Sequence, residues 1–250
     1  GHYNRSIGYV LCPPFAPEHF KVYRILYNAC RYLAVHGITM MRFDYAGTGD
    51  SSNEFEKIGV GTWIQNIMDA CTYMHQRTDV SKVGLIGCRL SSVWAALAAE
   101  KLGHKIHRLV MWDPIFDIHT YLYNQLRANL SEQMIKHGRV VENREKIVAR
   151  IESGEIVSIG GYGFTREFYL PAVQVNIINN PPELVTDLQV MTSSSQQNTE
   201  HTDVLRFLKH YSANSNLNDI ITLPKEVNWE LSKGYVTFPD QTFATILENL

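Results

Sequence analysis

One stretch of the sequence constrains the fold more than any other: residues 83–99, which read VGLIGCRLSSVWAALAA. The first part is a short apolar run, typical of a buried strand, and the Ala- and Leu-rich end is typical of a helix packed closely against that strand. Because only a few residues separate the two patterns, the sequence predicts a sharp strand-to-helix turn around Arg89.

The same alternation of strand and helix patterns continues along most of the chain. Further strands are predicted at 7–12, 38–44, 107–112, 188–192 and 219–223, and helices at 23–34, 63–77, 203–211 and 243–250, with a loop at 15–20. This order predicts the α/β class, with a mostly parallel sheet and helices on both of its faces. Ligands of such sheets bind at the carboxyl ends of the strands, where Pro14, Asp44, Arg89 and Asp113 are expected to gather.

The pattern changes after Tyr121, where residues to about Gly154 become helical and highly charged. A further short helix is expected near Thr165. We therefore expect a core formed by residues 1–123 and 181–250, and a cap or lid inserted at 124–180. Aromatic side chains are frequent around the cap, and we expect them to form its own core rather than line a pocket: Tyr121, Tyr123, Tyr162, Phe164, Phe168 and Tyr169.

Composition excludes several classes of protein. A net charge of −2, with 45% hydrophobic and 19% charged residues, indicates a globular protein and gives no electrostatic case for binding nucleic acid or an anionic membrane. No apolar run has the length of a membrane span, so a cytoplasmic location is expected. The four cysteines show no C-x-x-C spacing, which predicts neither a metal site nor disulfides. The glycine-rich run 44–51 matches no phosphate-binding motif, and no cofactor is predicted.

Several motifs together resemble the α/β-hydrolase superfamily, and within it the serine-aminopeptidase-like hydrolases found beside biosynthetic genes. They are Cys12-Pro13-Pro14-Phe15 with Glu18 and Arg24, Arg42 to Ser51, Trp63 with Asp69-Ala70, Gly87 to Ser92, and Trp112-Asp113-Pro114 with Tyr121. The resemblance covers about residues 7–121. It implies an α/β-hydrolase fold and an acyl, ester or thioester substrate.

The resemblance fails at the catalytic positions. The G-x-S-x-G turn of these enzymes falls on residues 87–91, which places Arg89 at the nucleophile. A guanidinium stays protonated and cannot attack a carbonyl. Some members of the group also have G-x-R-L here. The triad acid is expected after Thr192, where only Glu200 or Asp203 is available, and no histidine follows His210 to act as the base.

The same turn offers other candidate nucleophiles. A Cys88 thiol beside Arg89 would have a lowered pKa, but a packed, buried thiol is the alternative that we favour. Ser91 and Ser92 are expected to cap the helix. His19 and His119 are interpreted as surface residues. The candidate catalytic residues are therefore Arg89, Cys88 and Asp113, and the candidate ligand-binding residues are Pro14, Phe15, Glu18, Arg89, Leu90 and Tyr45.

Arg89 has two interpretations that do not exclude each other. It forms a structural ion pair with Glu18 or Asp113, since a buried charge needs a partner. Alternatively it binds a ligand's carboxylate or phosphate, helped by the backbone N–H groups at the helix N-terminus. Asp44 and Asp50 are expected to cap loops and helices rather than transfer protons.

Three functions remain open. The chain is a hydrolase or acyltransferase acting without an intact Ser-His-Asp triad, an inactive homologue that binds a small acyl or carboxylate ligand, or a subunit that binds a carrier protein or synthase. A homodimer is compatible with all three.

Overall fold

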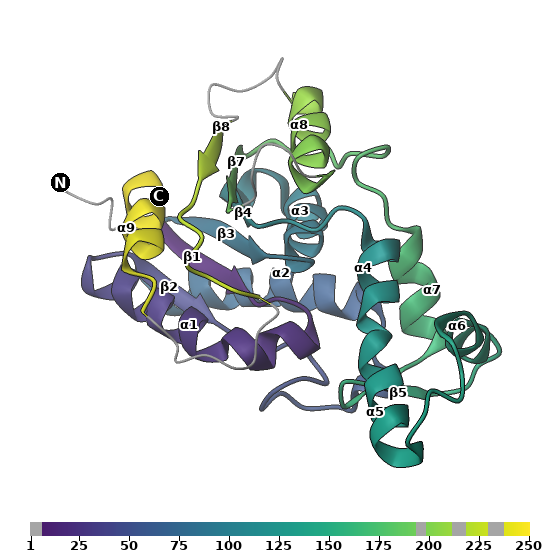
Figure 1. Ribbon diagram of the computed structural model, residues 1–250. Helices are drawn as coiled ribbons and strands as arrows, with labels where there is room; N and C mark the ends of the chain where they lie inside the picture. Colours follow the sequence, from purple (N-terminus) through teal and green to yellow (C-terminus); the bar gives the residue numbers. More distant parts are fainter. Residues whose placement is uncertain (1–6, 194–198, 212–218, 230–237) are drawn as a thin grey trace. The chain divides into compact units, whose positions relative to one another are not determined.

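A computed structural model of the chain describes residues 7–193, 199–211, 219–229 and 238–250. Its main sheet has the strand order β2-β1-β3-β4-β7-β8, and every neighbouring pair is parallel (Figure 1). The strands are β1 (Ile7–Cys12), β2 (Thr39–Arg42), β3 (Lys82–Cys88), β4 (Ile106–Trp112), β7 (Asp187–Thr192) and β8 (Asp219–Thr222). The predicted parallel α/β sheet is confirmed.

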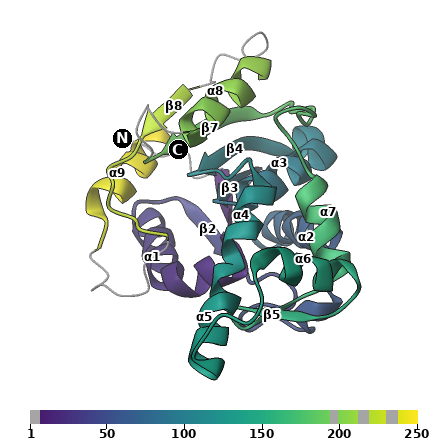
Figure 2. The ribbon, with the colours of Figure 1, turned by 45° about the vertical axis from the view of Figure 1, so that its right-hand side comes forward.

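Helices cover both faces of this sheet. They are α1 (Ala16–Val35), α2 (Val60–Arg77), α3 (Ser91–Leu102), α8 (Thr199–Tyr211) and α9 (Asp240–Asn249), with a 3₁₀ turn η2 (Gly103–Lys105). Figures 1 and 2 show α1 on one face of the sheet, and α2 and α3 on the other. On the second face the helices approach closely, since a Cβ added to Gly8 would lie 2.7 Å from the sulfur of Met74 in α2.

The start of α1 corrects one expectation, because the helix already begins at Ala16 within the predicted loop 15–20. A proline stands in its first turn, where the missing N–H is not needed for a helical hydrogen bond. The carbonyl of Phe15 accepts hydrogen bonds from the backbone N–H groups of Glu18 and His19, at 2.8 and 3.0 Å. The helix therefore starts ahead of the apolar periodicity that suggested it.

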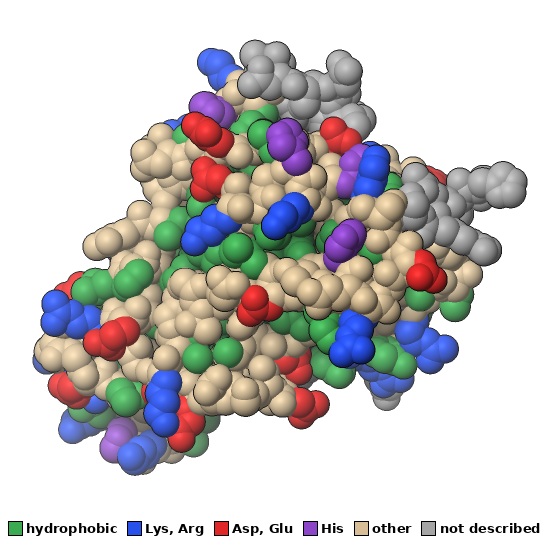
Figure 3. All heavy atoms as spheres, turned by 180° about the vertical axis from the view of Figure 1, so that it is seen from behind, with side chains coloured by type: hydrophobic (Ala, Val, Ile, Leu, Met, Phe, Trp, Pro, Cys, Tyr) green, Lys and Arg blue, Asp and Glu red, His purple; other side chains and the backbone are tan. Residues whose placement is uncertain are grey.

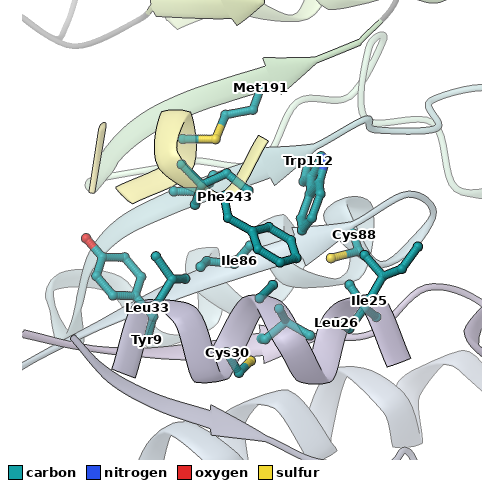
Figure 4. Close-up of a cluster of buried hydrophobic side chains, with 14 of the residues drawn as sticks. Tyr9, Ile25, Leu26, Cys30, Leu33, Ile86, Cys88, Trp112, Met191 and Phe243 are labelled. Carbon is teal, nitrogen blue, oxygen red and sulfur yellow. The ribbon is translucent and has the colours of Figure 1, made fainter. Parts of the chain in front are cut away.

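The core on the α1 face joins the sheet to the two helices α1 and α9 (Figure 4). Tyr9, Ile86 and Trp112 come from three adjacent strands, Leu26 from α1 and Phe243 from α9, and all are almost completely buried. Such a cluster fixes α1 and the strand ends whose loops carry the candidate site.

The chain divides into two compact units, one formed by residues 1–43, 64–116 and 177–250 and the other by 44–63 and 117–176. The second unit contains η1 (Phe55–Lys57), α4 (Ile118–Gln125), α5 (Arg127–His137), α6 (Arg144–Glu152), β5 (Val157–Ile159), β6 (Tyr162–Phe164) and α7 (Arg166–Gln174). Thr165 caps α7, the short helix expected near that residue.

Aromatic side chains form the core of the second unit. The Phe55 ring lies 5.8 Å from Trp63 and 5.4 Å from Phe168, and Phe164 and Phe168 are fully buried. Tyr169 is also buried, whereas Tyr123 is only partly so. These positions agree with the expectation that the aromatic residues build the unit's own core. None of the described helices is long and apolar enough to cross a membrane.

Candidate functional site

The turn between β3 and α3 has the backbone of a nucleophile elbow. Arg89 has φ +55°, in the left-handed region that L-residues rarely adopt. A Cβ added to Gly87 would lie 2.6 Å from the Cα of Ser92, so only glycine lets the helix fold back this tightly on the strand. The Ser92 hydroxyl donates a hydrogen bond to the Gly87 carbonyl at 2.7 Å and closes the turn.

The guanidinium of Arg89 is held by two partners. Its Nε lies 3.6 Å from Oε1 of Glu18, and its Nη1 donates to the backbone carbonyl of Asp113 at 3.3 Å. Only 10% of the Arg89 side chain and 3% of the Glu18 side chain are exposed, so the ion pair is buried. The predicted pairing with Glu18 is confirmed. The alternative pairing with the Asp113 carboxylate is wrong, because that carboxylate has other donors.

Those donors come from the loops that follow β7 and β8. Oδ1 of Asp113 accepts the backbone N–H of Ser193 at 2.7 Å, and both carboxylate oxygens lie 3.0 Å from the Ser193 hydroxyl. Oδ2 also accepts the indole N–H of Trp229 at 2.8 Å. Asp113 is buried, with φ +46°, so its backbone bends sharply at the end of β4 to aim the side chain at these donors.

Two residues at the strand ends occupy positions of a catalytic triad with different chemistry. Arg89 follows β3 at the nucleophile turn and Trp229 follows β8 where the base belongs, whereas Asp113 follows β4 and not β7, after which the acid is expected. The Arg89 Cζ lies 5.9 Å from the centre of the Trp229 ring, within the range of a cation–π contact. An indole N–H donates but cannot accept a proton, so this set lacks both nucleophile and base.

Cys88 is fully buried, and Figure 4 places its sulfur within the core cluster, near Ile25 of α1. Burial raises the pKa of its thiol well above the usual value, and the negative charges of Asp113 and Glu18 add to that effect. A thiol in this setting stays protonated at neutral pH. Its position favours the packed-thiol interpretation over catalysis.

The remaining candidates around the turn are also buried. Pro14 and Phe15, between β1 and α1, and Leu90, between β3 and α3, are buried. Ser91 stands at the position of the motif's second glycine and is fully buried. His19 corrects an expectation: it is only 7% exposed, with its ring 5.6 Å from that of Tyr23. His19 lies on the side of the first turn of α1 that faces the interior of the protein.

His119 is exposed, as expected, and its ring stacks on Tyr123 within the second unit. Two candidates from the glycine-rich run belong to that unit as well. Tyr45 is buried, with its ring stacked on Trp63 at 4.9 Å. Asp44 accepts the backbone N–H of Asp50 at 3.1 Å, which confirms its expected role in the loop.

The two carboxylates considered for the triad acid gain no support. Asp203 forms an ion pair with Arg206 on its own helix, at 3.3 Å. The side chain of Glu200 and residues 194–198 lie outside the described residues. Within the described part of the chain, no three His, Cys, Asp or Glu side chains gather to hold a metal ion.

Sequence reasoning missed Trp229 and Ser193 as partners of Asp113. Trp229 lies 116 residues from Asp113, and a tryptophan is not a residue type that a catalytic base predicts. The usable signal was the only tryptophan after the last strand, in the segment where a hydrolase of this fold carries its base.

Comparison with solved structures gives the class of fold. Est1E from Butyrivibrio proteoclasticus, solved with bound ferulic acid, matches with a TM-score of 0.67 and 16% identity over 98% of this chain and 89% of that one. The α/β hydrolase GrgF from Penicillium sp. sh18 matches with a TM-score of 0.63 and 15% identity, covering 97% and 86%. A proline iminopeptidase from Mycobacterium smegmatis matches at 0.59 and 14%, covering 99% and 90%.

The chain therefore has the α/β-hydrolase fold. No protein-family model and no curated protein matches its sequence. At these identities the structural likeness concerns the fold and not the chemistry, which must be argued from the chain's own residues.

Proposed function

We propose that this chain is an α/β-hydrolase homologue that binds, rather than hydrolyses, a small acyl or carboxylate-bearing molecule at the elbow edge of the sheet. The observation that carries the proposal is the pair of replacements at the catalytic positions, a guanidinium at the nucleophile and an indole at the base. A guanidinium cannot attack the acyl carbon as the serine of a serine hydrolase does. An indole cannot accept a proton as the histidine does.

The chemistry of Arg89 supports the ligand class. A guanidinium carries five N–H donors, and one of those on Arg89 donates to the Asp113 carbonyl while the Glu18 carboxylate balances its charge. Its remaining donors suit the planar geometry of a carboxylate. The ferulic acid bound by Est1E, a protein of the same fold, carries a carboxylic acid group and an aromatic ring, and so supports the same choice.

The motifs from Cys12 to Tyr121 further support a place in the serine-aminopeptidase-like group, as a pseudoenzyme derived from acyl-transferring ancestors. On this proposal Glu18 and Asp113 hold the arginine in place, and a ligand is recognised without being cleaved.

Activity-based labelling tests the absence of hydrolysis. The purified chain should not react with a fluorophosphonate probe, and should not turn over p-nitrophenyl esters. A cysteine-directed probe at pH 8 should leave Cys88 unlabelled in the folded chain, because burial holds its thiol pKa high, and should label it after unfolding in urea. Labelling of Cys88 in the folded chain, or ester turnover, contradicts the proposal.

Rebuilding the triad tests the roles of the three positions. Arg89→Ser alone should give no esterase activity, because no base is in place. Adding Trp229→His puts an imidazole where the indole now donates to Asp113, and this double variant should react with the fluorophosphonate. Circular dichroism confirms that each variant folds. Turnover by Arg89→Ser alone would refute the assignment of Trp229 to the base position.

Direct binding tests the ligand class. Titration with ferulate, followed by calorimetry, should give a signal in the native chain that is lost in Arg89→Met/Glu18→Gln, which removes the cation without leaving a buried carboxylate. Binding that survives in that variant places the carboxylate elsewhere and overturns the elbow site.

A further inference from the structure

A cavity lies at the edge of the main sheet opposite the elbow, where the strands begin. It has a volume of about 620 Å³ and is lined by the end of α2, by the starts of β3, β4 and β7, and by η2. Since the elbow follows the carboxyl end of β3 and Lys82 begins that strand, the two places are separated by the full length of β3. Nothing proposed for the elbow involves this cavity.

Basic and titratable side chains dominate the lining of the cavity. His75 comes from α2, Lys82 from β3, His104 and Lys105 from η2 and His107 from β4, and Asp187 is the one carboxylate among the lining residues. Figure 3 shows histidine side chains, in purple, lying beside lysine and arginine side chains on the face seen from behind. The lining of the cavity is therefore locally basic, although the chain as a whole has a net charge of −2.

Lys82 and Lys105 form no ion pair within the part of the chain that the structure describes. The pKa of His107 is lowered, first by partial burial and second by the charge of Lys82, although Asp187 opposes the shift. A concave site lined by one sign of charge focuses its field on an ion of the opposite sign.

The floor of the cavity is apolar. Val83 and Ile106 are buried and Leu102 is half-buried, so these side chains offer a surface against which a ring or short alkyl group can pack. The volume falls within the range of small-molecule sites in proteins, which are mostly apolar with a few polar groups that fix the ligand's orientation.

We propose that this cavity is a second ligand site, which binds a small organic anion with the anionic group, a phosphate monoester or carboxylate, between Lys82 and Lys105 and the apolar part on Ile106. Histidine N–H groups supply further donors to the anion. The site is independent of the elbow and of whether the elbow binds anything.

The experiment uses the full chain and four probes measured by calorimetry: phenyl phosphate, benzoate, inorganic phosphate and benzyl alcohol. Phenyl phosphate should bind most tightly, inorganic phosphate and benzoate more weakly, and benzyl alcohol not at all. In proton–carbon NMR spectra phenyl phosphate should shift the ring resonances of His75, His104 and His107, which places the ligand in the cavity.

Substitution of the two lysines tests the charge. Lys82→Met/Lys105→Met should weaken phenyl phosphate binding about tenfold or more, the loss expected for charge-assisted hydrogen bonds. The matched control Lys101→Met/Lys146→Met removes the same charge at two exposed lysines outside the cavity and should leave the affinity unchanged.

Each contrary result overturns the proposal in a distinct way. No heat and no histidine shift with phenyl phosphate at 10-fold molar excess over a millimolar concentration of the chain contradicts the site. If the control variant binds phenyl phosphate as weakly as Lys82→Met/Lys105→Met, the loss reflects the net charge of the chain and not the two lysines of the cavity. Loss of binding in Arg89→Met/Glu18→Gln with retention in Lys82→Met/Lys105→Met assigns the anion to the elbow, and so supports the elbow proposal while refuting this one.

Discussion

Positively charged side chains are buried at one edge of the main sheet and exposed at the other. At the elbow edge the cation is buried and surrounded: Arg89 lies against Glu18, the Asp113 carbonyl and the Trp229 ring. At the other edge Lys82 and Lys105 are exposed around a cavity and form no ion pair with the described residues. One strand, β3, begins at the second arrangement and ends at the first.

The difference teaches how the burial of a cation determines what its removal, or the removal of its partner, does to stability. A buried cation must be neutralised by the protein itself, and removing its partner leaves an uncompensated charge in a medium of low dielectric constant. An exposed cation is solvated, and its removal affects mainly what binds to it. The substitutions below test this contrast by stability, beginning with the largest expected change.

Removing Glu18 should have the largest effect. Glu18→Ala leaves the Arg89 guanidinium buried without its carboxylate and should lower the free energy of unfolding by roughly 3–5 kcal/mol. Urea unfolding followed by circular dichroism measures the change. Glu54→Ala, which breaks the exposed ion pair with Lys57, is the control and should have no measurable effect. Similar losses in both variants would remove the contrast between buried and exposed charge.

Removing one donor from Asp113 should have a smaller effect. Trp229→Phe keeps an aromatic ring beside Arg89 and Trp112 but deletes the N–H that donates to Oδ2, while Ser193 still donates to the carboxylate. The expected loss is about 1.5–3 kcal/mol, the value for one hydrogen bond to a charged group. If Trp229→Phe unfolds at the same urea concentration as the native chain, the indole does not hold Asp113 in place.

The sequence predicts the scaffold of this edge well, because local patterns define it. β1 has the predicted bounds Ile7–Cys12, since an apolar run ends directly at two prolines. The strand-to-helix turn at Arg89 follows from the apolar and Ala-rich runs on either side of it. Glu18 was one of two partners expected for Arg89, because the resemblance places its loop where an active hydrolase forms the oxyanion hole. The structure shows that the two residues follow neighbouring strands, β1 and β3.

Contacts between distant segments could not be predicted in the same way. Trp229 and Ser193 reach Asp113 from loops after two other strands, and no periodicity in the sequence reports which side chain a loop directs inward. The β5–β6 hairpin of the second unit was missed for a different reason. Its two-residue turn, Gly160-Gly161 with φ +59° and +87°, is a recognised hairpin signal that was overlooked beside the stronger helical patterns.

At the opposite edge, substitution of the lysines should leave stability almost unchanged. Lys82→Met/Lys105→Met removes two exposed charges that form no ion pair with the described residues, so the free energy of unfolding should change by less than about 0.5 kcal/mol. The same urea titration as for Glu18→Ala provides the comparison. A loss as large as that of Glu18→Ala would mean that these lysines have a structural role, and that the two edges do not differ as argued.

The pH dependence of stability should show the smallest effect, at His107. Partial burial and the charges of Lys82 and Arg108 lower its pKa in the folded chain, although Asp187 opposes them, while the unfolded chain keeps the ordinary value near 6.5. Between these two pKa values the unfolded state binds more protons, so stability falls as the pH is lowered through 6.5. His107→Gln should reduce that fall in urea titrations between pH 7 and pH 5. Phenyl phosphate should have the same effect on the native chain, because a bound anion favours the protonated imidazole.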